Sequence, residues 1–321
     1  MKHISILTLE GATMTSLDGS HQLFTRVNDF LRYRGESPFY TIELIATNNE
    51  TYLNGGLYKI QANRIINDII KTDLIIIPII CGDFAKMIKA NEMFVDWIMR
   101  QYHNGAEVAS LCVGSFFLAS TGLLDGKKCA THWASKNDFQ AMFPAVNVLE
   151  DSIITDENGI YTSGGTYSYL NLLLYIIEKH VGREISVLAS KMFEIDIERK
   201  SQNQFAIFMG QKRHDDAEVL KAQEFIENNS DKILTVGEVC LMFGVGRRTF
   251  ERRFKKSTGN SFSEYMQRVK VESVKKQLEI CSKTVNEIIF EVGYNDINAF
   301  RKVFKKYVGM SPVDYRKKYK I

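Results

Sequence analysis

The feature that most constrains the fold is an internal repeat in the last third of the chain. The segment LTVGEVCLMFGVGRRTFERRFKKSTGNSFSEY aligns with KTVNEIIFEVGYNDINAFRKVFKKYVGMSPVDY at an offset of 49 to 50 residues. Each copy opens with Thr-x-x-Glu, at Thr235 and at Thr284, the pattern of a capping box at the start of a helix. An apolar run then meets Gly244 or Gly293, as a helix-ending turn requires. Each copy therefore predicts two short helices joined by a tight turn.

The second helix of each copy has one apolar face and one polar face. Phe250 with Phe254, and Phe300 with Phe304, are four residues apart and share the inward face. The outward faces carry side chains that read base edges or hold phosphates. They are Arg247, Arg248, Glu251, Arg252 and Lys255 in the first copy, and Asn298, Arg301, Lys302 and Lys305 in the second. This pattern describes two helix-turn-helix units, each with a second helix suited to the major groove.

Charge is unevenly distributed between the two ends of the chain. Residues 218–321 hold 21 Lys and Arg against 13 Asp and Glu, a net charge of +8, whereas the remainder carries −5. A basic domain suits a polyanion such as double-stranded DNA, because fixed cations release the counterions condensed on phosphates. Charge alone also fits a solvated basic surface. Duplication of the helical pair is what favours the DNA-binding interpretation.

The ending GYNDINAFRKVFKKYVGMSPVDYR, and the repeat as a whole, resemble the AraC/XylS family of transcription regulators over about residues 220–319. The resemblance implies an all-α domain of seven helices with a double helix-turn-helix, in which a long helix over about 263–279 separates two reading heads. Carried over by position, the base-facing residues are Arg248, Glu251 and Arg252 in the first head, and Asn298 and Lys302 in the second. Gly246 stands where the family usually has Ser or Thr as the helix cap, and glycine is a weaker cap.

The first two thirds of the chain predict an α/β domain. Apolar strands are expected at 3–9, 41–46, 74–80 and 107–111, and amphipathic helices notably at 22–33 and 91–103. Strands without polar alternation indicate a sheet covered on both faces, so we expect a doubly wound, three-layer parallel-sheet domain of flavodoxin-like type. Neither GxGxxG after the first strand nor GxxxxGK[ST] is present, so a dinucleotide cofactor and P-loop chemistry lack support and no cofactor is predicted.

The segment ASLCVGSFFLASTGLLDGKKCATHW holds the most chemistry. Cys112 falls where a strand ends and a helix begins at Val113, which describes a nucleophile elbow. A helix N-terminus at this point would lower the pKa of the thiol and could hold an anion. With His132 it could form a catalytic dyad. The alternative is that both residues are ordinary buried side chains.

The same segment resembles the PfpI/ThiJ-like superfamily of cysteine-elbow α/β proteins over roughly residues 2–182. Catalytic members pair the cysteine with a carboxylate after the first strand, where this chain offers Glu10 and Asp18, neither at a convincing position. The resemblance also implies a ligand pocket at the carboxyl ends of the strands. Its expected residues are Ser16, Cys81, Gly82, Cys112, Val113, His132 and Trp133. Cys129, Cys240, Cys281 and Trp97 are interpreted as core residues.

Five widely spaced cysteines without a CxxC pair indicate neither a disulfide framework nor a metal site. The longest apolar run, 74–81, is far too short for a bilayer span of roughly 20 residues, and the N-terminus lacks a signal-peptide pattern, so we expect a cytoplasmic protein.

We expect a sensing domain over 1–194, a linker over 195–217 and a DNA-binding domain over 218–321. The linker includes SQNQF, a Gln-rich stretch that resembles the join in GlxA-like regulators, and Phe205, Ile207 and Phe208 are expected to dock on one domain.

The sequence thus predicts a regulator that senses a small polar effector, with nitrogen-containing metabolites among the candidates by resemblance. Its expected partners are double-stranded DNA, RNA polymerase and a second copy bound through the N-terminal domain. We expect no enzymatic activity. Two alternatives stay open, a cysteine-dependent amidohydrolase or glyoxalase-like enzyme and a nonspecific DNA-associated protein. Activation is the expected mode, although the sequence does not distinguish it from repression.

Overall fold

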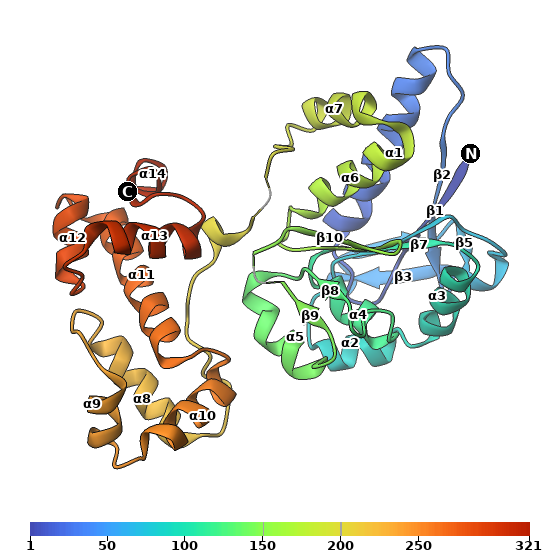
Figure 1. Cartoon of the computed structure of the whole chain (residues 1–321). Coiled ribbons are helices and arrows are strands. Elements are labelled where there is room, and N and C mark those ends of the chain that lie inside the picture. The colour runs from blue at the N-terminus through green and yellow to red at the C-terminus, as the bar shows by residue number, and fades with distance from the viewer. Residues whose placement is uncertain (150, 200) are drawn as a thin grey trace. The chain divides into compact units, whose positions relative to one another are not determined.

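The chain divides after Gln202, inside the linker expected from the sequence. A computed structural model describes residues 1–149, 151–199 and 201–321. It separates into one unit over Met1–Gln202 and another over Asn203–Ile321 (Figure 1). The first unit has one hydrophobic core and the second has two.

The first unit is built on a seven-stranded sheet with the strand order β10-β11-β7-β6-β1-β2-β5. The strands are β1 (Lys2–Leu7), β2 (Tyr40–Ala46), β5 (Arg64–Ile65), β6 (Leu74–Ile77), β7 (Glu107–Ser110), β10 (Ile154–Glu157) and β11 (Ile160–Ser163). All neighbouring pairs are parallel except β10 with β11, which form an antiparallel hairpin at one edge. In register, Ile4 of β1 lies opposite Ile42 of β2 and Leu74 of β6. Short pairs β3–β4 (Glu50–Leu53 and Tyr58–Gln61) and β8–β9 (Lys128–Cys129 and Asn147–Val148) lie outside this sheet.

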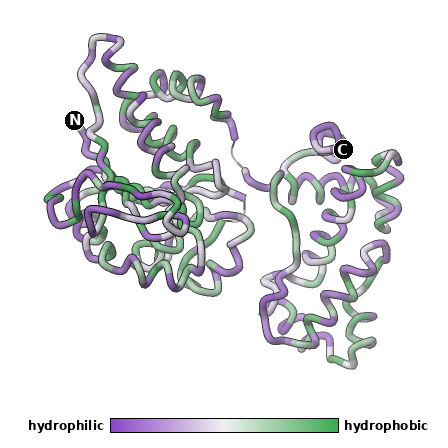
Figure 2. The backbone as a smooth tube through the Cα atoms, turned by 180° about the vertical axis from the view of Figure 1, so that it is seen from behind, coloured by the Kyte–Doolittle hydropathy of each residue, from purple (hydrophilic) through white to green (hydrophobic). Residues whose placement is uncertain are grey.

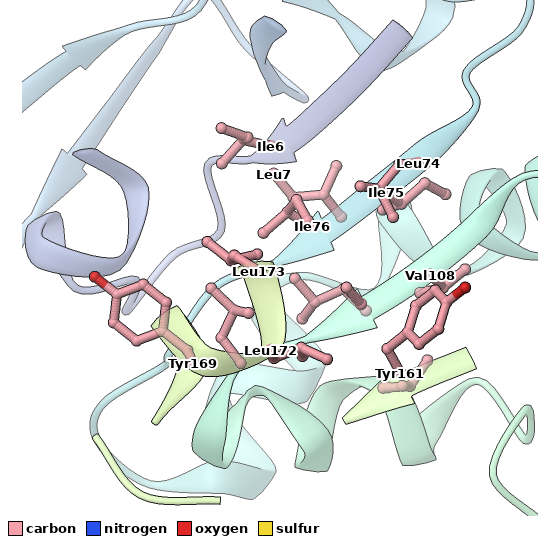
Figure 3. Close-up of a cluster of buried hydrophobic side chains, with 14 of the residues drawn as sticks. Ile6, Leu7, Leu74, Ile75, Ile76, Val108, Tyr161, Tyr169, Leu172 and Leu173 are labelled. Atoms are coloured by element: carbon pink, nitrogen blue, oxygen red, sulfur yellow. The ribbon is translucent and has the colours of Figure 1, made fainter. Parts of the chain in front are cut away.

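Helices cover both faces of the sheet, which confirms the predicted three-layer arrangement. Figure 1 shows α1 (Met14–Tyr33), α6 (Tyr169–Val181) and α7 (Arg183–Met192) on one face. It shows α2 (Phe84–Ala90), α3 (Met93–His103) and α4 (Ser115–Ser120) on the other, with α5 (Lys136–Met142) nearby. Apolar side chains of β1, β6 and β7 meet those of α6 in the core (Figure 3). The continuous burial of Leu74–Ile77 explains why these strands read as unbroken apolar runs.

Several predicted boundaries are wrong. Strand β6 ends at Ile77 rather than at residue 80, because Pro78 has no N–H to continue the ladder. Strand β1 stops at Leu7 and β7 at Ser110, short of the expected ends, and α3 begins at Met93. Helix α1 begins eight residues before the expected start, through Gly19, a weak helix former. Gly19 leaves room for the Tyr169 hydroxyl, which donates to the Thr15 carbonyl at 2.9 Å.

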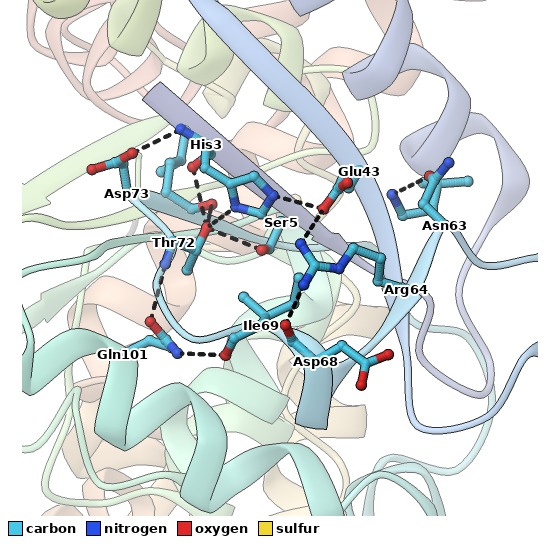
Figure 4. Close-up of polar contacts among 12 residues, drawn as sticks. His3, Ser5, Glu43, Asn63, Arg64, Asp68, Ile69, Thr72, Asp73 and Gln101 are labelled. Atoms are coloured by element: carbon cyan, nitrogen blue, oxygen red, sulfur yellow. Dashed lines mark hydrogen bonds and ion pairs between the residues drawn. The ribbon is translucent and has the colours of Figure 1, made fainter. Parts of the chain in front are cut away.

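A network of polar side chains lies at the edge of the sheet where β1 and β6 begin (Figure 4). The His3 imidazole lies 2.8 Å from the Glu43 carboxylate and 3.0 Å from the Thr72 hydroxyl. The Asp73 carboxylate accepts from the His3 amide, and the Gln101 amide oxygen accepts from the Thr72 amide. These contacts satisfy polar groups buried beside the core, so we assign the network a structural role.

The second unit contains seven α-helices in the described residues, as the resemblance implied. They are α8 (Ala217–Asn228), α9 (Val236–Met242), α10 (Arg247–Thr258), α11 (Phe262–Ile280), α12 (Val285–Glu291), α13 (Ile297–Val308) and α14 (Pro312–Tyr319). Figure 2 shows hydrophilic and hydrophobic residues alternating along these helices, as expected for helices that each bury one face. We call α8–α10 the first head and α12–α14 the second head. The long helix α11 is shared by both.

Local signals position these helices as predicted. Both capping boxes form, Thr235 with Glu238 and Thr284 with Glu287. Gly244 and Gly293 both have positive φ, at 62° and 75°, which glycine adopts without strain. A third capping box, Ser261 with Glu264, starts α11. It was not predicted, although the same Ser-x-x-Glu signal is present in the sequence.

Residues 203–215, which precede α8, form an arm that begins with a 3-10 helix (Asn203–Phe205) beside α13 and continues along α11. The Phe208 amide donates to the Glu272 carboxylate at 3.1 Å, and Lys275 donates to the Ala206 carbonyl at 2.7 Å. The Phe208 ring packs edge-on against Tyr265. In the second unit, therefore, the arm belongs to the folded structure.

Candidate functional site

The first candidate surface is the outer face of α10. Phe250 and Phe254 are buried in the core of the first head. The predicted contact residues Arg247, Arg248, Glu251, Arg252 and Lys255 are all exposed. Arg247 and Glu251 form an ion pair at 3.1 Å along the helix. No ion pair is described for the exposed cations Arg248, Arg252 and Lys255. As expected, Gly246 at the N-cap provides no side-chain cap.

The second candidate surface is the outer face of α13. Its inward face buries Phe300 and Phe304, and Asn298, Arg301, Lys302 and Lys305 are exposed. Asp296 caps this helix by accepting from the Asn298 and Ala299 amides, both at 2.9 Å. Helix α13 is therefore capped by a side chain and α10 is not.

Sequence reasoning missed a residue that anchors α10. Arg253 donates from Nε and Nη2 to the two carboxylate oxygens of Asp216, at 2.8 and 2.7 Å, and also pairs with Glu218. Asp216 is in turn the N-cap of α8 and accepts from the Val219 amide. This bidentate contact holds α10 against the start of α8. In the second head the equivalent position is Val303, and that difference between the repeats was the available signal.

The elbow in the first unit has the predicted backbone geometry. Cys112 follows β7 and has a φ of 52°, a left-handed conformation that is unusual for a side chain other than glycine. Its amide donates to the Ser163 hydroxyl at 3.0 Å. Gly114 leaves room for the Pro78 carbonyl, which a Cβ atom would meet. The elbow therefore lies where β6, β7 and β11 end.

Burial controls the acidity of the Cys112 thiol. Burial raises the pKa of the thiol to about 12, although hydrogen bonds from the Val113 backbone and Thr166 oppose the rise. The backbone N–H at the start of the helix does lower this pKa, as expected, but desolvation of the thiolate outweighs it because only 2% of the residue is exposed. At neutral pH the sulfur is a thiol and a poor nucleophile.

His132 does not form a dyad with Cys112 in the described contacts. Its Nδ1 accepts from the Ala134 amide at 3.1 Å, and burial lowers the pKa of the imidazole. Neither candidate carboxylate contacts the thiol among the described residues. Glu10 is exposed, and Asp18 accepts from Gln22 instead.

The remaining predicted pocket residues gather at the carboxyl edge of the sheet. The Cys81 amide donates to the Gly11 carbonyl at 2.8 Å, which joins the loops after β1 and β6. Ser16 is buried and its hydroxyl accepts from the Ile79 amide at 3.2 Å. Cys81 and Gly82 are exposed, and Val113 is half-buried.

A buried glutamine completes this edge and was not predicted. Gln202 donates to the Thr131 carbonyl at 2.9 Å and to the Ser152 carbonyl at 3.3 Å, and it accepts from the Trp133 amide at 3.1 Å. A Cβ at Gly164 would meet its carboxamide. The last residue of the first unit is thus held beside the predicted pocket residues His132 and Trp133.

The remaining cysteines and Trp97 lie outside the candidate sites. Trp97 and Cys129 are fully buried in the first unit, Cys240 is buried in the first head and Cys281 is half-buried. No cluster of three metal-ligating side chains occurs among the described residues. Within residues 1–149, 151–199 and 201–321, no helix combines the length and apolar character that a membrane crossing needs.

Comparisons with known proteins assign each unit. Residues 31–179 match the DJ-1/PfpI family, and residues 239–318 match a helix-turn-helix domain. A variant of a DJ-1 superfamily protein from Salmonella typhimurium aligns in structure with a TM-score of 0.50 and 12% identity, over 61% of this chain and all of that one. That likeness establishes the fold of the first unit.

Two curated relatives extend across both units. The HTH-type transcriptional regulator GbdR of Pseudomonas aeruginosa is 28% identical over 241 residues, which cover 74% of this chain and 65% of GbdR. The HTH-type transcriptional regulator GlxA of Rhizobium meliloti is 21% identical over 67% of this chain and 66% of its own length. The matched region thus spans slightly under two thirds of these relatives. The chain therefore carries an N-terminal DJ-1/PfpI domain followed by a C-terminal AraC-type helix-turn-helix domain, the architecture of AraC-family regulators such as GbdR and GlxA.

Proposed function

We propose that this chain is a ligand-responsive transcription regulator that binds double-stranded DNA at specific sequences. The observation that carries the proposal is the pair of recognition helices, α10 and α13, each buried on its phenylalanine face and exposed on a polar, basic face. Such helices read base edges in the major groove, and two of them joined by a long helix address two adjacent grooves.

Selection of genomic fragments by the full-length protein at near-physiological salt tests the proposal. We expect an enriched motif with two parts, one for each head. Arg248→Ala or Arg252→Ala should then weaken binding by roughly 1 to 3 kcal/mol and relax the preference at one base pair, as the loss of a base contact does. Lys302→Ala should act on the other part of the motif.

A matched control separates base reading from charge. Lys221→Ala removes one exposed cation from α8 without touching either recognition helix, and it should leave the sequence preference unchanged. Equal recovery of all fragments, with variants that only weaken binding uniformly and reduce its salt dependence, would instead establish a nonspecific DNA-associated protein.

The DJ-1/PfpI domain is proposed to sense a small polar effector, with nitrogen-containing metabolites as the class to test first. Its site lies at the carboxyl edge of the parallel sheet, where open α/β folds bind ligands. Ser16, Cys81, Gly82, Cys112, Val113, His132 and Trp133 are the residues proposed to line it. The domain has no catalytic role in this proposal, because the Cys112 thiol is protonated at neutral pH and lacks a described contact with His132 or a carboxylate.

The enzyme alternative makes an opposite prediction for Cys112→Ala. A cysteine-dependent amidohydrolase or glyoxalase-like enzyme would lose turnover in this variant. A sensor would keep its DNA binding and would lose at most affinity for the effector.

A route from effector to DNA runs through residues 202 and 203. Gln202 is hydrogen-bonded beside Trp133 in the first unit, and the arm that starts at the next residue is hydrogen-bonded to α11 in the second. An effector that favours one arrangement of the Gln202 contacts would therefore change the restraint on the arm. Coupling between effector and DNA requires that the effector bind one of these two arrangements more tightly than the other.

We also propose that the regulator is a cytoplasmic protein that forms a homodimer through its first domain. RNA polymerase is its proposed protein partner at the promoter. Two copies bound to repeated half-sites gain affinity through effective concentration. Gel filtration at micromolar concentration should give a dimer, and a monomer at every concentration tested would contradict this part of the proposal.

A further inference from the structure

The two heads have separate hydrophobic cores. The first half of α11 contributes Phe262, Tyr265 and Val269 to the first head, and its second half contributes Val274 and Leu278 to the other. The clusters share no residue. Apolar packing therefore stabilises each head against α11 but does not by itself join one head to the other.

A buried lysine joins them instead. Lys270, in the middle of α11, is 6% exposed. Its ammonium group donates to the Lys232 carbonyl at 2.8 Å, in the turn between α8 and α9 of the first head. It also donates to the Val292 carbonyl, at the end of α12 in the second head. One cation thus satisfies backbone acceptors from both heads.

The two turns also touch each other beside this lysine. A Cβ atom built at Gly293 would lie 2.8 Å from the Asp231 carbonyl oxygen, 3.3 Å from an Ile233 side-chain carbon and 3.3 Å from the Lys270 ammonium. Gly293 is therefore required both by its positive φ and by close approach of the other head. Gly244, its equivalent in the first head, also has positive φ but has nothing within 4 Å of such a Cβ.

We propose that Lys270 and Gly293 form a joint that sets the separation and angle between the two reading heads, with Lys270 as a positioning residue for bipartite operator recognition. This inference rests on the proposed function for its DNA consequence, although the joint itself does not. Two recognition helices gain from being linked only when both can engage their grooves at once. If either head moved away, the buried ammonium group would lose a hydrogen-bond acceptor that water does not replace. That cost favours the one arrangement in which the carbonyls of both heads reach the lysine.

The variants are chosen in matched pairs. Lys270→Met removes the cation and keeps most of the side-chain volume, and Lys276→Met makes the same change at an exposed position of the same helix. Gly293→Ala adds a methyl group at the contact, and Gly244→Ala adds one at the same kind of backbone position in open space. Lys270→Arg keeps the charge and the donors. If Lys270→Met fails to fold by circular dichroism, Gly293→Ala against Gly244→Ala decides the question.

The first readout is the distance between the heads in the full-length protein without DNA. Spin labels on p-acetylphenylalanine at Thr249 and Ala299, exposed and equivalent positions of α10 and α13, avoid labelling the native cysteines. Labelled chains are diluted with unlabelled chains so that double electron–electron resonance measures only distances within one molecule. We expect one narrow distribution in the wild type, Lys276→Met and Gly244→Ala, and a broadened or shifted one in Lys270→Met and Gly293→Ala. Unchanged distributions in both joint variants would overturn the proposal.

The second readout is spacing discrimination on the selected operator, with one base pair inserted between its two parts. The wild type should lose about ten-fold or more in affinity on the altered spacing, since simultaneous engagement is lost. Lys270→Met and Gly293→Ala should bind the native spacing more weakly and distinguish the two spacings by only a few-fold, with recovery in Lys270→Arg. A variant that is merely less stable would keep the wild-type ratio, and that result would also overturn the proposal. If no operator is enriched even by the wild type while the distance results hold, the proposed function fails and the joint stands.

Discussion

The carboxylate of Glu107 allows the stability of the first unit to be predicted as a function of pH. Its Oε2 lies 2.6 Å from His180 Nε2, and the Tyr161 hydroxyl donates to Oε1. Burial alone would raise the pKa of Glu107, but these hydrogen bonds, with the nearby charges of His180 and Lys2, outweigh it and lower the pKa from 4.5 to about 2. Each pKa unit corresponds to about 1.4 kcal/mol. With 22% of the side chain exposed, the ionised form contributes about 2 to 3 kcal/mol of stability.

The pKa of Glu107 is lower in the folded state than in the unfolded chain, so its ionisation stabilises the fold as pH rises. The contribution is fully present above the unfolded pKa near 4.5 and is lost as pH falls towards the folded value near 2. Glu107→Gln should therefore destabilise the first unit by about 2 to 3 kcal/mol at pH 7. The difference from wild type should shrink by about 1 kcal/mol between pH 6 and pH 3.5.

Urea unfolding followed by tryptophan fluorescence measures this difference for the first unit alone, because Trp97 and Trp133 are the two tryptophans of the chain and both belong to it. Glu184→Gln, which changes an exposed carboxylate paired with Arg34, is the control and should have little effect. A Glu107→Gln difference that stays constant from pH 7 to pH 3.5 would refute the assignment of the pH dependence to this carboxylate.

Three further predictions concern other parts of the chain. Alkylation by iodoacetamide at pH 8, followed by mass spectrometry, should modify exposed Cys81 and spare Cys112, whose raised pKa of about 12 leaves it protonated; modification of Cys112 at a comparable rate would contradict this. Gln202→Ala should shift the fluorescence of the adjacent Trp133, measured in a Trp97→Phe background, and an unchanged spectrum would argue against the described contact. Phe304→Ala, which empties a fully buried site, should cost about 3 to 5 kcal/mol in the second head, seen by circular dichroism as a lower urea midpoint.

The two helix-turn-helix pairs of the second unit could be predicted from the sequence because their signals are local, whereas the long helix and the total of seven helices were implied by the family resemblance. Capping boxes, turn glycines and phenylalanines four residues apart act within one or two helical turns. Even the missed capping box at Ser261 has the same short pattern. The repeat adds a second copy of each signal. A pattern that occurs twice at the same spacing arises by chance less often than one that occurs once.

Contacts between distant residues could not be predicted in the same way. Strands β10 and β11 form an antiparallel hairpin at one edge of the sheet. Their sequences are short, and only their pairing in the folded sheet distinguishes them from loop. Lys270 is typical of a solvated helix position in the sequence, yet it is buried because two turns far from it in sequence close over its ammonium group. Gln202 similarly lies in a polar segment that resembles a flexible linker, and its partners Thr131 and Ser152 are 71 and 50 residues away.

The elbow shows that the backbone geometry of a motif can be predicted from the sequence when the acidity of its side chain cannot. The turn at Cys112 depends on backbone features, namely a positive φ, the Ser163 hydroxyl that accepts its amide and a glycine two residues later. The acidity of the thiol depends on something else, which is whether water or a cation reaches the sulfur. Here burial outweighs the nearby hydrogen bonds, and neither His132 nor a carboxylate contacts the thiol among the described residues. The backbone geometry of an elbow and the acidity of its thiol are therefore set by different features, and the first does not predict the second.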